Sequence, residues 1–371
     1  MRVLSLAPLT IARERAGYRI RVCKRYAYAG YLYAIFLNVF HVYISSLGKD
    51  SKNEYIKTIE NLPLLWLLTI LDVSLGTIIT GLGALFSISR MNNVIEQVYY
   101  MEQVFPAHRQ KEVNNKNKRL ILFMIISRML LDGHFLVYTA FINKIDKGWV
   151  GLLSNRLKFT VVCSVQAYVF ALYEEMLSKI RIVREELQDL ADLLEFEYIP
   201  SSAAFTESVN LRLRKIVEKI DFLKKIFGKM NQSNQYTAFF IYINIITRLI
   251  ETAFDLLKFG PEGLTVMITF RFLFLLHHYF VLVMFTEPFH GIEIEIQALK
   301  LQASRIATTD YVTDSIPAPL EMLYDELSTM NMTFSPLGII TIDRSLLAKT
   351  LGAAISYLVI VLQFKVDSGK N

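Results

Sequence analysis

Cysteine and charge are both scarce in this chain of 371 residues. Its two cysteines, Cys23 and Cys163, are too few for a disulfide framework, and neither belongs to a metal-ligand spacing. Charged residues make up 20% of the chain and hydrophobic residues 53%, whereas roughly a quarter of an ordinary soluble domain is charged. With a mean hydropathy of +0.36, this composition indicates that lipid is the solvent. We therefore expect a single membrane domain over residues 1–371 rather than two or three soluble domains.

Groups that would carry catalysis or nucleic-acid binding are also missing. Aromatic residues lie inside apolar runs instead of alternating with Lys and Arg on a solvated face, so we expect no nucleic-acid partner. Glu287 and His290 form one half of the paired Glu-x-x-His arrangement of di-iron bundles, and the sequence has no second copy. The adjacent residues His277 and His278 point about 100° apart on a helix and share no metal-binding face. The sequence predicts no catalytic residues, no metal and no cofactor.

Long apolar runs dominate the chain. Seven of them reach the length of about 20 helical residues that crosses a bilayer. Helix is the expected conformation, because each backbone amide inside hydrocarbon must be satisfied within its own segment and the runs lack the alternation of barrel strands. The sequence thus predicts an all-α membrane protein with transmembrane helices near residues 26–46, 62–87, 120–142, 159–177, 237–257, 264–285 and 345–364.

The distribution of Lys and Arg predicts how these helices are oriented. Residues 1–25 carry 7 such side chains and residues 89–119 carry 6, whereas residues 47–61 carry 3. By the positive-inside rule, the N-terminus and the loops after the even-numbered spans lie in the cytoplasm. With seven crossings the C-terminus lies outside, which is the inverse of the topology of a G-protein-coupled receptor.

Two of the expected cytoplasmic loops, at residues 178–236 and 286–344, are long. The first contains two series of apolar residues spaced three or four apart, the pattern of an amphipathic helix. We expect the two loops to form a compact helical anchor bundle. The pattern is compatible with packing inside one subunit and with assembly of several subunits. The apolar positions are Val183, Leu187, Leu190 and Leu194, then Leu213, Ile216, Ile220, Leu223 and Phe227.

The last span carries small and polar residues along one helical face. A carboxamide is costly in a lipid-facing helix, so Gln363 is expected to face another helix or water. In one interpretation, the small and amide residues hold neighbouring helices together within one subunit. In the other, several copies surround an axis and form an oligomeric cation channel, with Ile360 as an apolar constriction and Asp367 at the outer mouth. The stripe consists of Gly352, Ser356, Ile360, Gln363 and Asp367.

The same span carries a motif that resembles a known family. Ser356 and Tyr357 are followed by five hydrophobic residues, and then by Gln363 and Phe364. This order is similar to the seventh-span signature of insect gustatory receptors, which is Thr-Tyr, five hydrophobic residues and Gln-Phe, with Ser here in place of Thr. Residues 338–347 resemble the segment before that signature, so the specific similarity covers about the final tenth of the chain.

The resemblance implies a gustatory receptor of the insect chemoreceptor superfamily, whose members are ligand-gated cation channels. It implies a homotetramer, or a heteromer with other gustatory receptor subunits, in the plasma membrane of sensory neurons. By position in the motif, Gln363 and Phe364 lie at or beside the extracellular gate, and Tyr357 braces the helix behind it. The compact length implies a bitter-type receptor rather than a sugar receptor. The other expected pore residues are Ser356, Ile360 and Asp367.

The resemblance also implies that a small-molecule tastant enters from outside into a cavity among the second to sixth spans. Ionisable residues inside a membrane are functional candidates by default. Arg248 and Glu251 are three residues apart, and an ion pair that supports the fold is an alternative account of both. Aromatic residues such as Tyr138 either line an apolar pocket or pack and anchor at the interface. The candidates for ligand contact are Asp72, Arg128, Asp132, His134, Tyr138, Asn244, Arg248, Glu251, His277 and His278.

A multi-span transporter is the competing interpretation, because the buried charges Arg248, Arg271 and Asp132 could form a substrate or proton path. Such transporters usually contain two related halves with broken helices, and the sequence shows no internal repeat. Two glycosylation sequons, at Asn231 and Asn331, fall in loops expected in the cytoplasm, so neither is expected to carry sugar.

Overall fold

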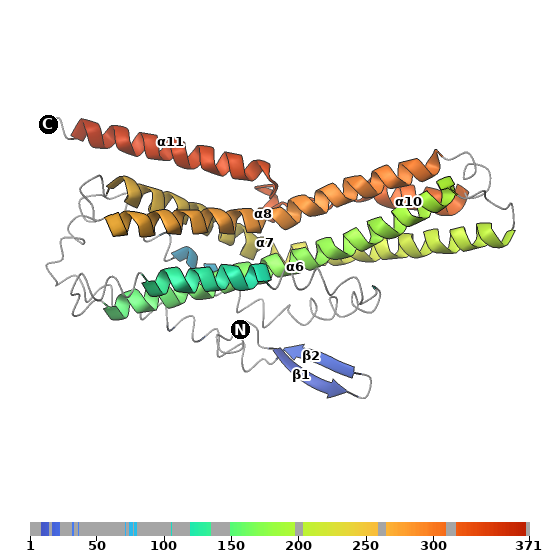
Figure 1. The fold of residues 1–371 in the computed structure, drawn as a ribbon, viewed down its shortest axis with the longest axis horizontal. Helices are drawn as coiled ribbons and strands as arrows, with labels where there is room; N and C mark the ends of the chain where they lie inside the picture. Colours follow the sequence, from blue (N-terminus) through green and yellow to red (C-terminus); the bar gives the residue numbers. More distant parts are fainter. Residues whose placement is uncertain are drawn as a thin grey trace.

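The structure is a computed structural model that describes most of the chain from residue 119 onward and small parts of the chain before it. The described residues are 9–14, 17–22, 32, 36, 71, 74–76, 78, 79, 105, 119–134, 149–196, 203–258, 265–308 and 317–368. Helices dominate these residues, as Figure 1 shows. The predicted spans at 26–46 and 62–87 lie almost wholly outside the described residues.

Four long helices form the body of the fold. Helix α6 runs Trp149–Phe196, α7 runs Ala203–Lys258, α8 runs Thr265–Ala307 and α11 runs Ser345–Ser368. Helices α6, α7 and α8 contact one another, and helix α10, Pro317–Thr329, packs on α7 and α8. At one end of Figure 1 the second half of α6, the first half of α7 and the second half of α8 lie beside α10. The opposite halves of these helices lie at the other end, where α11 also lies.

The amphipathic loops are direct extensions of the apolar helices. Within the described residues, two stretches are helical, long and apolar enough to cross a bilayer, Ala204–Phe254 in α7 and Ile268–Ala307 in α8. Helix α6 likewise continues past residue 177 without a break. Residues 178–180 contain neither Gly nor Pro, so nothing in the local sequence ends the helix there.

The two amphipathic patterns predicted between residues 183 and 227 are confirmed. All nine apolar positions are buried, with exposed fractions of 3% or less. Because burial of one Leu, Ile or Val side chain contributes about 1.5–3 kcal/mol, these positions are a principal source of stability. At the edge of this contact Lys219 on α7 donates from Nζ to Oε1 of Glu186 on α6, at 2.6 Å.

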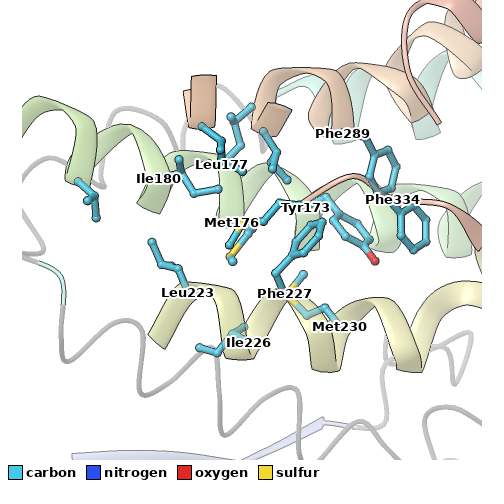
Figure 2. Close-up of a cluster of buried hydrophobic side chains, with 14 of the residues drawn as sticks. Tyr173, Met176, Leu177, Ile180, Leu223, Ile226, Phe227, Met230, Phe289 and Phe334 are labelled. Atoms are coloured by element: carbon cyan, nitrogen blue, oxygen red, sulfur yellow. The ribbon is translucent and has the colours of Figure 1, made fainter. Parts of the chain in front are cut away.

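An aromatic cluster joins α6, α7 and α8 to the segment that follows α10, as Figure 2 shows. Phe289 stacks on Phe334 with ring centroids 4.6 Å apart and an interplanar angle of 11°. The ring of Tyr173 lies 4.3 Å from that of Phe289 and 5.3 Å from that of Phe334. The hydroxyl of Tyr173 donates to Oδ1 of Asn231 at 3.0 Å, so this buried polar group is satisfied. Phe334 therefore fixes the chain between α10 and α11 to the core.

Helices α6 and α8 approach each other closely at Gly291. A Cβ atom at this position would lie 2.7 Å from Cδ2 and 3.3 Å from Cδ1 of Leu177 on α6. Leu177 is 2% exposed, so neighbouring side chains restrict its movement. Pro288 lies one turn earlier in α8 and supplies no backbone N–H. An alanine at position 291 would therefore force the side chain of Leu177 to shift.

A two-stranded antiparallel hairpin near the N-terminus is an exception to the predicted all-α class. Strand β1, Leu9–Glu14, pairs with β2, Gly17–Val22, and places Leu9 opposite Val22. Apolar and basic residues alternate along β2, from Tyr18 and Arg19 onward, and a period of two is typical of a strand. The hairpin thus follows from the local pattern rather than from the apolar runs that predict helices.

Candidate functional site

A small pocket lies among the helical residues 119–134 and helices α6, α7 and α8. Its volume is about 20 Å³, which admits about one water molecule, and it is partly enclosed. The described apolar wall consists of Val162, Cys163, Ile245 and Val281. The described polar lining consists of Arg128, Gln166, Asn244, Arg248, His277 and His278.

Arg128 is held firmly at this pocket. Its side chain is 4% exposed, and its Nε donates to Oδ2 of Asp132 at 2.9 Å. The two residues are four positions apart, so they lie on the same face of one helix. The guanidinium also lies over the ring of Phe274 on α8, 5.2 Å from its centroid. A buried guanidinium without a partner is costly, and Asp132 and Phe274 together stabilise its charge.

Two adjacent histidines on α8 also line the pocket. The Nδ1 atom of His277 lies 3.4 Å from Oγ of Ser127, which donates to the carbonyl oxygen of Met124 at 3.1 Å. The rings of His277 and His278 have centroids 5.8 Å apart and an interplanar angle of 67°. Both rings reach one pocket although successive helical positions point about 100° apart. The described residues contain no group of three or more His, Cys, Asp or Glu side chains placed to hold a metal ion.

The structure brings half of the ten predicted ligand-contact residues to the pocket. Asp132 lies behind the lining, bound to its partner guanidinium. His134 is exposed, and its Nδ1 lies 2.9 Å from the carbonyl oxygen of Leu130. Glu251 is half-buried on α7, one turn after a lining residue. Asp72 and Tyr138 lie outside the described residues. The residues brought together are Arg128, Asn244, Arg248, His277 and His278.

Three lining residues on α6, namely Val162, Cys163 and Gln166, were not among the predicted ligand-contact residues. Gln166 is 7% exposed and Cys163 is 5% exposed, and both lie within the predicted span 159–177. Gln166 could have been predicted from the sequence, because a carboxamide within an apolar run is costly unless it faces a protein partner or water. The sulfur of Cys163 lies 3.9 Å from the carbonyl oxygen of Met124, and its apolar neighbours in sequence gave no comparable signal.

Three residues of the predicted pore stripe lie on the exposed side of helix α11. Gly352, Ser356 and Gln363 are exposed, whereas Thr350 and Ala354 are buried. At 3.6 residues per turn, the three exposed residues lie within about 40° of one another and roughly opposite the two buried residues. The three residues therefore lie within the exposed part of α11, which also includes the apolar residues Leu351, Ile355 and Val359.

The buried side of α11 is fixed to α7. Tyr242 on α7 and Thr350 on α11 place their hydroxyl oxygens 2.9 Å apart, within hydrogen-bond distance. Tyr357 is half-buried, between the exposed and the buried sides. The backbone of α11 includes the other predicted pore residues, whose side chains lie outside the described part of the structure: Ile360, Phe364 and Asp367.

A carboxylate caps the beginning of α11. Oδ1 of Asp343 accepts hydrogen bonds from the backbone N–H of Leu346 at 3.0 Å and from the hydroxyl of Ser345 at 2.6 Å. Partial burial opposes ionisation, but these hydrogen bonds and the charge of Lys349 outweigh it and hold the pKa of Asp343 below its ordinary value of 3.8. A carboxylate in this position satisfies backbone donors that a helix leaves unpaired.

The next residue ties the beginning of α11 to α8. Arg344 donates from Nη2 to Oε1 of Glu287 at 2.6 Å and from Nε to Oε2 at 3.2 Å. These hydrogen bonds to Glu287 and its negative charge raise the pKa of Arg344. Both Asp343 and Arg344 belong to residues 338–347, so this segment sets how α11 begins relative to α8.

Comparisons with known proteins agree with this architecture. A profile of the family described as 7tm chemosensory receptor matches residues 1–368. The gustatory receptor for sugar taste 43a of Drosophila melanogaster is 23% identical over 185 residues, which are 47% of this chain and 41% of that receptor. The alignment thus spans less than half the length of this relative.

Solved structures of the insect olfactory receptor OR5 from Machilis hrabei share the fold. The receptor structure covers 98% of this chain with a TM-score of 0.66 and 10% identity, and 96% of its own chain is matched. The structure of the same receptor in complex with eugenol gives a TM-score of 0.67 at 10% identity, over 98% of this chain and 95% of that one.

Proposed function

Because the chain belongs to the 7tm chemosensory receptor family, we propose that it is a tastant-gated, non-selective cation channel in the plasma membrane of sensory neurons. The family is membrane-embedded, and family and fold together favour a receptor over an enzyme. The observation that supports a channel is the position of Gly352, Ser356 and Gln363 on the exposed side of α11. A wettable stripe that points away from its own subunit is what a pore built from several copies requires.

The proposed topology has seven transmembrane helices, a cytoplasmic N-terminus and an extracellular C-terminus. The excess of Lys and Arg in residues 1–25 and 89–119 supports this orientation. In it, residues 178–236 and 286–344 form the cytoplasmic anchor bundle. The burial of apolar positions on α6 and α7 over these residues supports a packed bundle rather than solvated loops.

The proposed pore is formed by four copies of α11 around one axis. Ser356 and Gln363 line the conduit, Ile360 forms an apolar constriction, and Asp367 favours cations at the outer mouth. Phe364 lies beside Gln363 at the extracellular gate. Tyr357 braces the helix from the side, which agrees with its half-buried position. The subunits are identical or belong to related gustatory receptors.

The polar pocket is the proposed tastant site. At about 20 Å³ it is smaller than any organic tastant, so its helices must separate before a ligand is fully enclosed. Asn244 lines the pocket on α7, and Tyr242, two residues earlier, contacts Thr350 on α11. A ligand that binds better when the helices are apart would shift α7 and, through this contact, α11.

Bitter compounds are the first tastants that we propose to test. The similarity to a receptor named for sugar taste adds sugars to the same screen. Neither class follows from the family alone.

Recording ionic currents from cells that express the full chain tests the proposal. At least one bitter compound or sugar in the screen should evoke a cation current, and Gln363→Ala and Phe364→Ala should alter its gating or permeation. Gln302→Ala is the matched control, because Gln302 lies near the far end of α8 beside Arg305. Unchanged currents in both α11 variants, with normal surface expression, would contradict the proposal that α11 lines the ion path.

A further inference from the structure

Helix α8 contains a proline near its middle. Pro288 cannot donate a hydrogen bond to the carbonyl oxygen of Met284, and its ring crowds that carbonyl, so a helix bends at such a position. Figure 1 shows α8 changing direction near its middle. The proline therefore divides α8 into a first half, residues 265–287, and a second half, residues 288–307, which meet where one backbone hydrogen bond is missing.

The two halves of α8 have different surroundings. The first half lines the polar pocket with residues such as His277 and Val281. The second half is fixed to α6 by the close contact at Gly291 and by Glu295, whose Oε1 accepts a hydrogen bond from Nε of Arg181 at 2.9 Å. A displacement of helices at the pocket would therefore move the first half relative to the second.

The chain that leads into α11 is attached to both halves of α8. Phe334 stacks on Phe289, which follows the proline directly, with ring centroids 4.6 Å apart. Arg344 donates two hydrogen bonds, of 2.6 and 3.2 Å, to the carboxylate of Glu287, which precedes the proline directly. The two attachments therefore lie on opposite sides of Pro288.

Between these attachments the chain forms a closed turn. The backbone N–H of Ile342 donates to the carbonyl oxygen of Phe334 at 3.0 Å, and the side chain of Ile342 is 3% exposed. Leu337 and Gly338 have φ angles of 57° and 68°. A leucine keeps such an angle only where the surrounding structure imposes it. The turn therefore stays with the second half of α8, and only residues 343 and 344 separate it from α11.

The pair of Glu287 and Arg344 sets position more than stability. Its side chains are 42% and 55% exposed, and ion pairs this exposed contribute little to folding. Two parallel hydrogen bonds nevertheless fix the direction between a guanidinium and a carboxylate as well as their distance. The neighbouring carboxylate of Asp343 is bound through Oδ1 to the backbone N–H of Leu346 and the hydroxyl of Ser345. Arg344 is thus directed to Glu287.

We propose that Pro288 is a hinge at which the first half of α8 pivots, and that the pair of Glu287 and Arg344 transmits this movement to the beginning of α11. The proposal rests on the proposed function, in which a tastant separates the helices at the pocket and α11 lines the ion path. Glu287 moves with the first half and carries Arg344 with it. The closed turn stays with the anchor bundle through Phe334, so α11 changes direction relative to that bundle.

Hydrogen–deuterium exchange of the purified, detergent-solubilised full chain tests the hinge without a ligand. Pro288→Ala restores the missing backbone donor, so the amides of residues 286–292 should exchange about two- to tenfold more slowly. Because the pair transmits the movement, the amides of residues 349–353 in α11 should also slow, by about twofold or more. Alanine is smaller than proline and favours helix, so we expect this variant to fold.

Further variants identify the route to α11. Glu287→Ala removes the acceptor of Arg344. In its background Pro288→Ala should still slow exchange in α8 but leave residues 349–353 unchanged. Arg344→Ala should have the same effect, and the double variant no larger one. Glu293→Ala is the matched control, because it removes a carboxylate from the second half of the same helix, and it should leave the transfer intact.

Several results would overturn the proposal. Unchanged exchange around residue 288 in Pro288→Ala would refute the hinge. Slowing of α11 that persists in Glu287→Ala would assign the transfer to another contact, such as the one between Tyr242 and Thr350. If Pro288→Ala does not fold, the unaltered chain decides. Its residues 286–292 should then exchange faster than residues 277–284 and 295–303, and uniform protection along α8 would refute the hinge.

Current recordings separate this failure from failure of the proposed function. The expected exchange pattern without any cation current evoked by the bitter compounds and sugars would leave the hinge standing and refute the channel. Evoked currents together with uniform exchange along α8 would do the reverse.

Discussion

Replacing Gly291 by alanine should destabilise the packing of α8 on α6. The added methyl group would lie 2.7 Å from Cδ2 of Leu177, which is closer than carbon atoms approach in folded proteins. Leu177 is 2% exposed, so it can move away only by displacing other core side chains. Overpacking of this kind costs about 1–3 kcal/mol.

The expected cost exceeds what the substitution gains elsewhere. Alanine in place of glycine within a helix stabilises it by about 0.5–1 kcal/mol, because it lowers the entropy of the unfolded chain. At Gly228 on α7, alanine should give this stabilisation without a steric cost, because a Cβ atom there would meet nothing within 4 Å. Gly228→Ala is therefore a matched control that should raise stability, whereas Gly291→Ala should lower it.

Apparent melting temperatures of the detergent-solubilised protein, measured at one scan rate, test this pair. After the gain from alanine is subtracted, the net loss is up to about 2.5 kcal/mol, which for a chain of this length corresponds to a decrease of up to about 3 °C. The double variant identifies the cause. Leu177→Ala alone should destabilise by about 2–5 kcal/mol, but in its background Gly291→Ala should raise stability slightly, as Gly228→Ala does, because the clashing atoms are gone. An equal decrease in both backgrounds, or an increase in the unaltered background, would refute the steric argument.

Three further predictions concern α11 and the topology. The hydrogen bonds that lower the pKa of Asp343 stabilise the fold above pH 3.8, and this stabilisation is lost as the pH falls through the lower folded value. The difference in apparent melting temperature between the unaltered chain and Asp343→Asn should therefore shrink below about pH 3.8. Tyr242→Phe and Thr350→Val should each lower stability by about 0.5–1.5 kcal/mol, and the double variant by less than their sum, as thermal unfolding can show. Glycosidase treatment of the chain from animal cells should leave its electrophoretic mobility unchanged, because the proposed topology places Asn231 and Asn331 in the cytoplasm, and a mobility shift would contradict that topology.

The sequence predicted the helical core well because its pattern repeats over many residues. Positions such as Leu187 and Leu213 belong to series with helical spacing, and the structure buries every member. Helix continuity was harder to predict. The apolar span ending near residue 177 and the amphipathic pattern from residue 183 differ in composition, yet a chain without Gly or Pro between them forms one helix, α6. The hairpin of β1 and β2 was not predicted, since two short strands give a weaker signal than a long apolar run.

The pocket could be predicted only in part. Arg248 and His277 stood out because charged and titratable groups are rare in apolar spans. Their meeting with Arg128 depends on how three helices far apart in sequence cross, which no local spacing encodes. Gly291 shows the same limit. Its role follows from the contact with Leu177, 114 positions earlier, rather than from its neighbours in sequence.

Cysteine modification during ligand-evoked currents tests the central claim most directly, because it asks whether the exposed stripe of α11 meets the ion path. A charged, membrane-impermeant thiol reagent is applied to cells that express Gln363→Cys or Ala354→Cys. Cells that express the unaltered chain are the control for modification of the two native cysteines. Ala354 is 8% exposed and lies on the opposite side of α11. The account predicts that the reagent reduces the current through Gln363→Cys channels and leaves Ala354→Cys channels unchanged. Modification that affects both equally, or only Ala354→Cys, would contradict it.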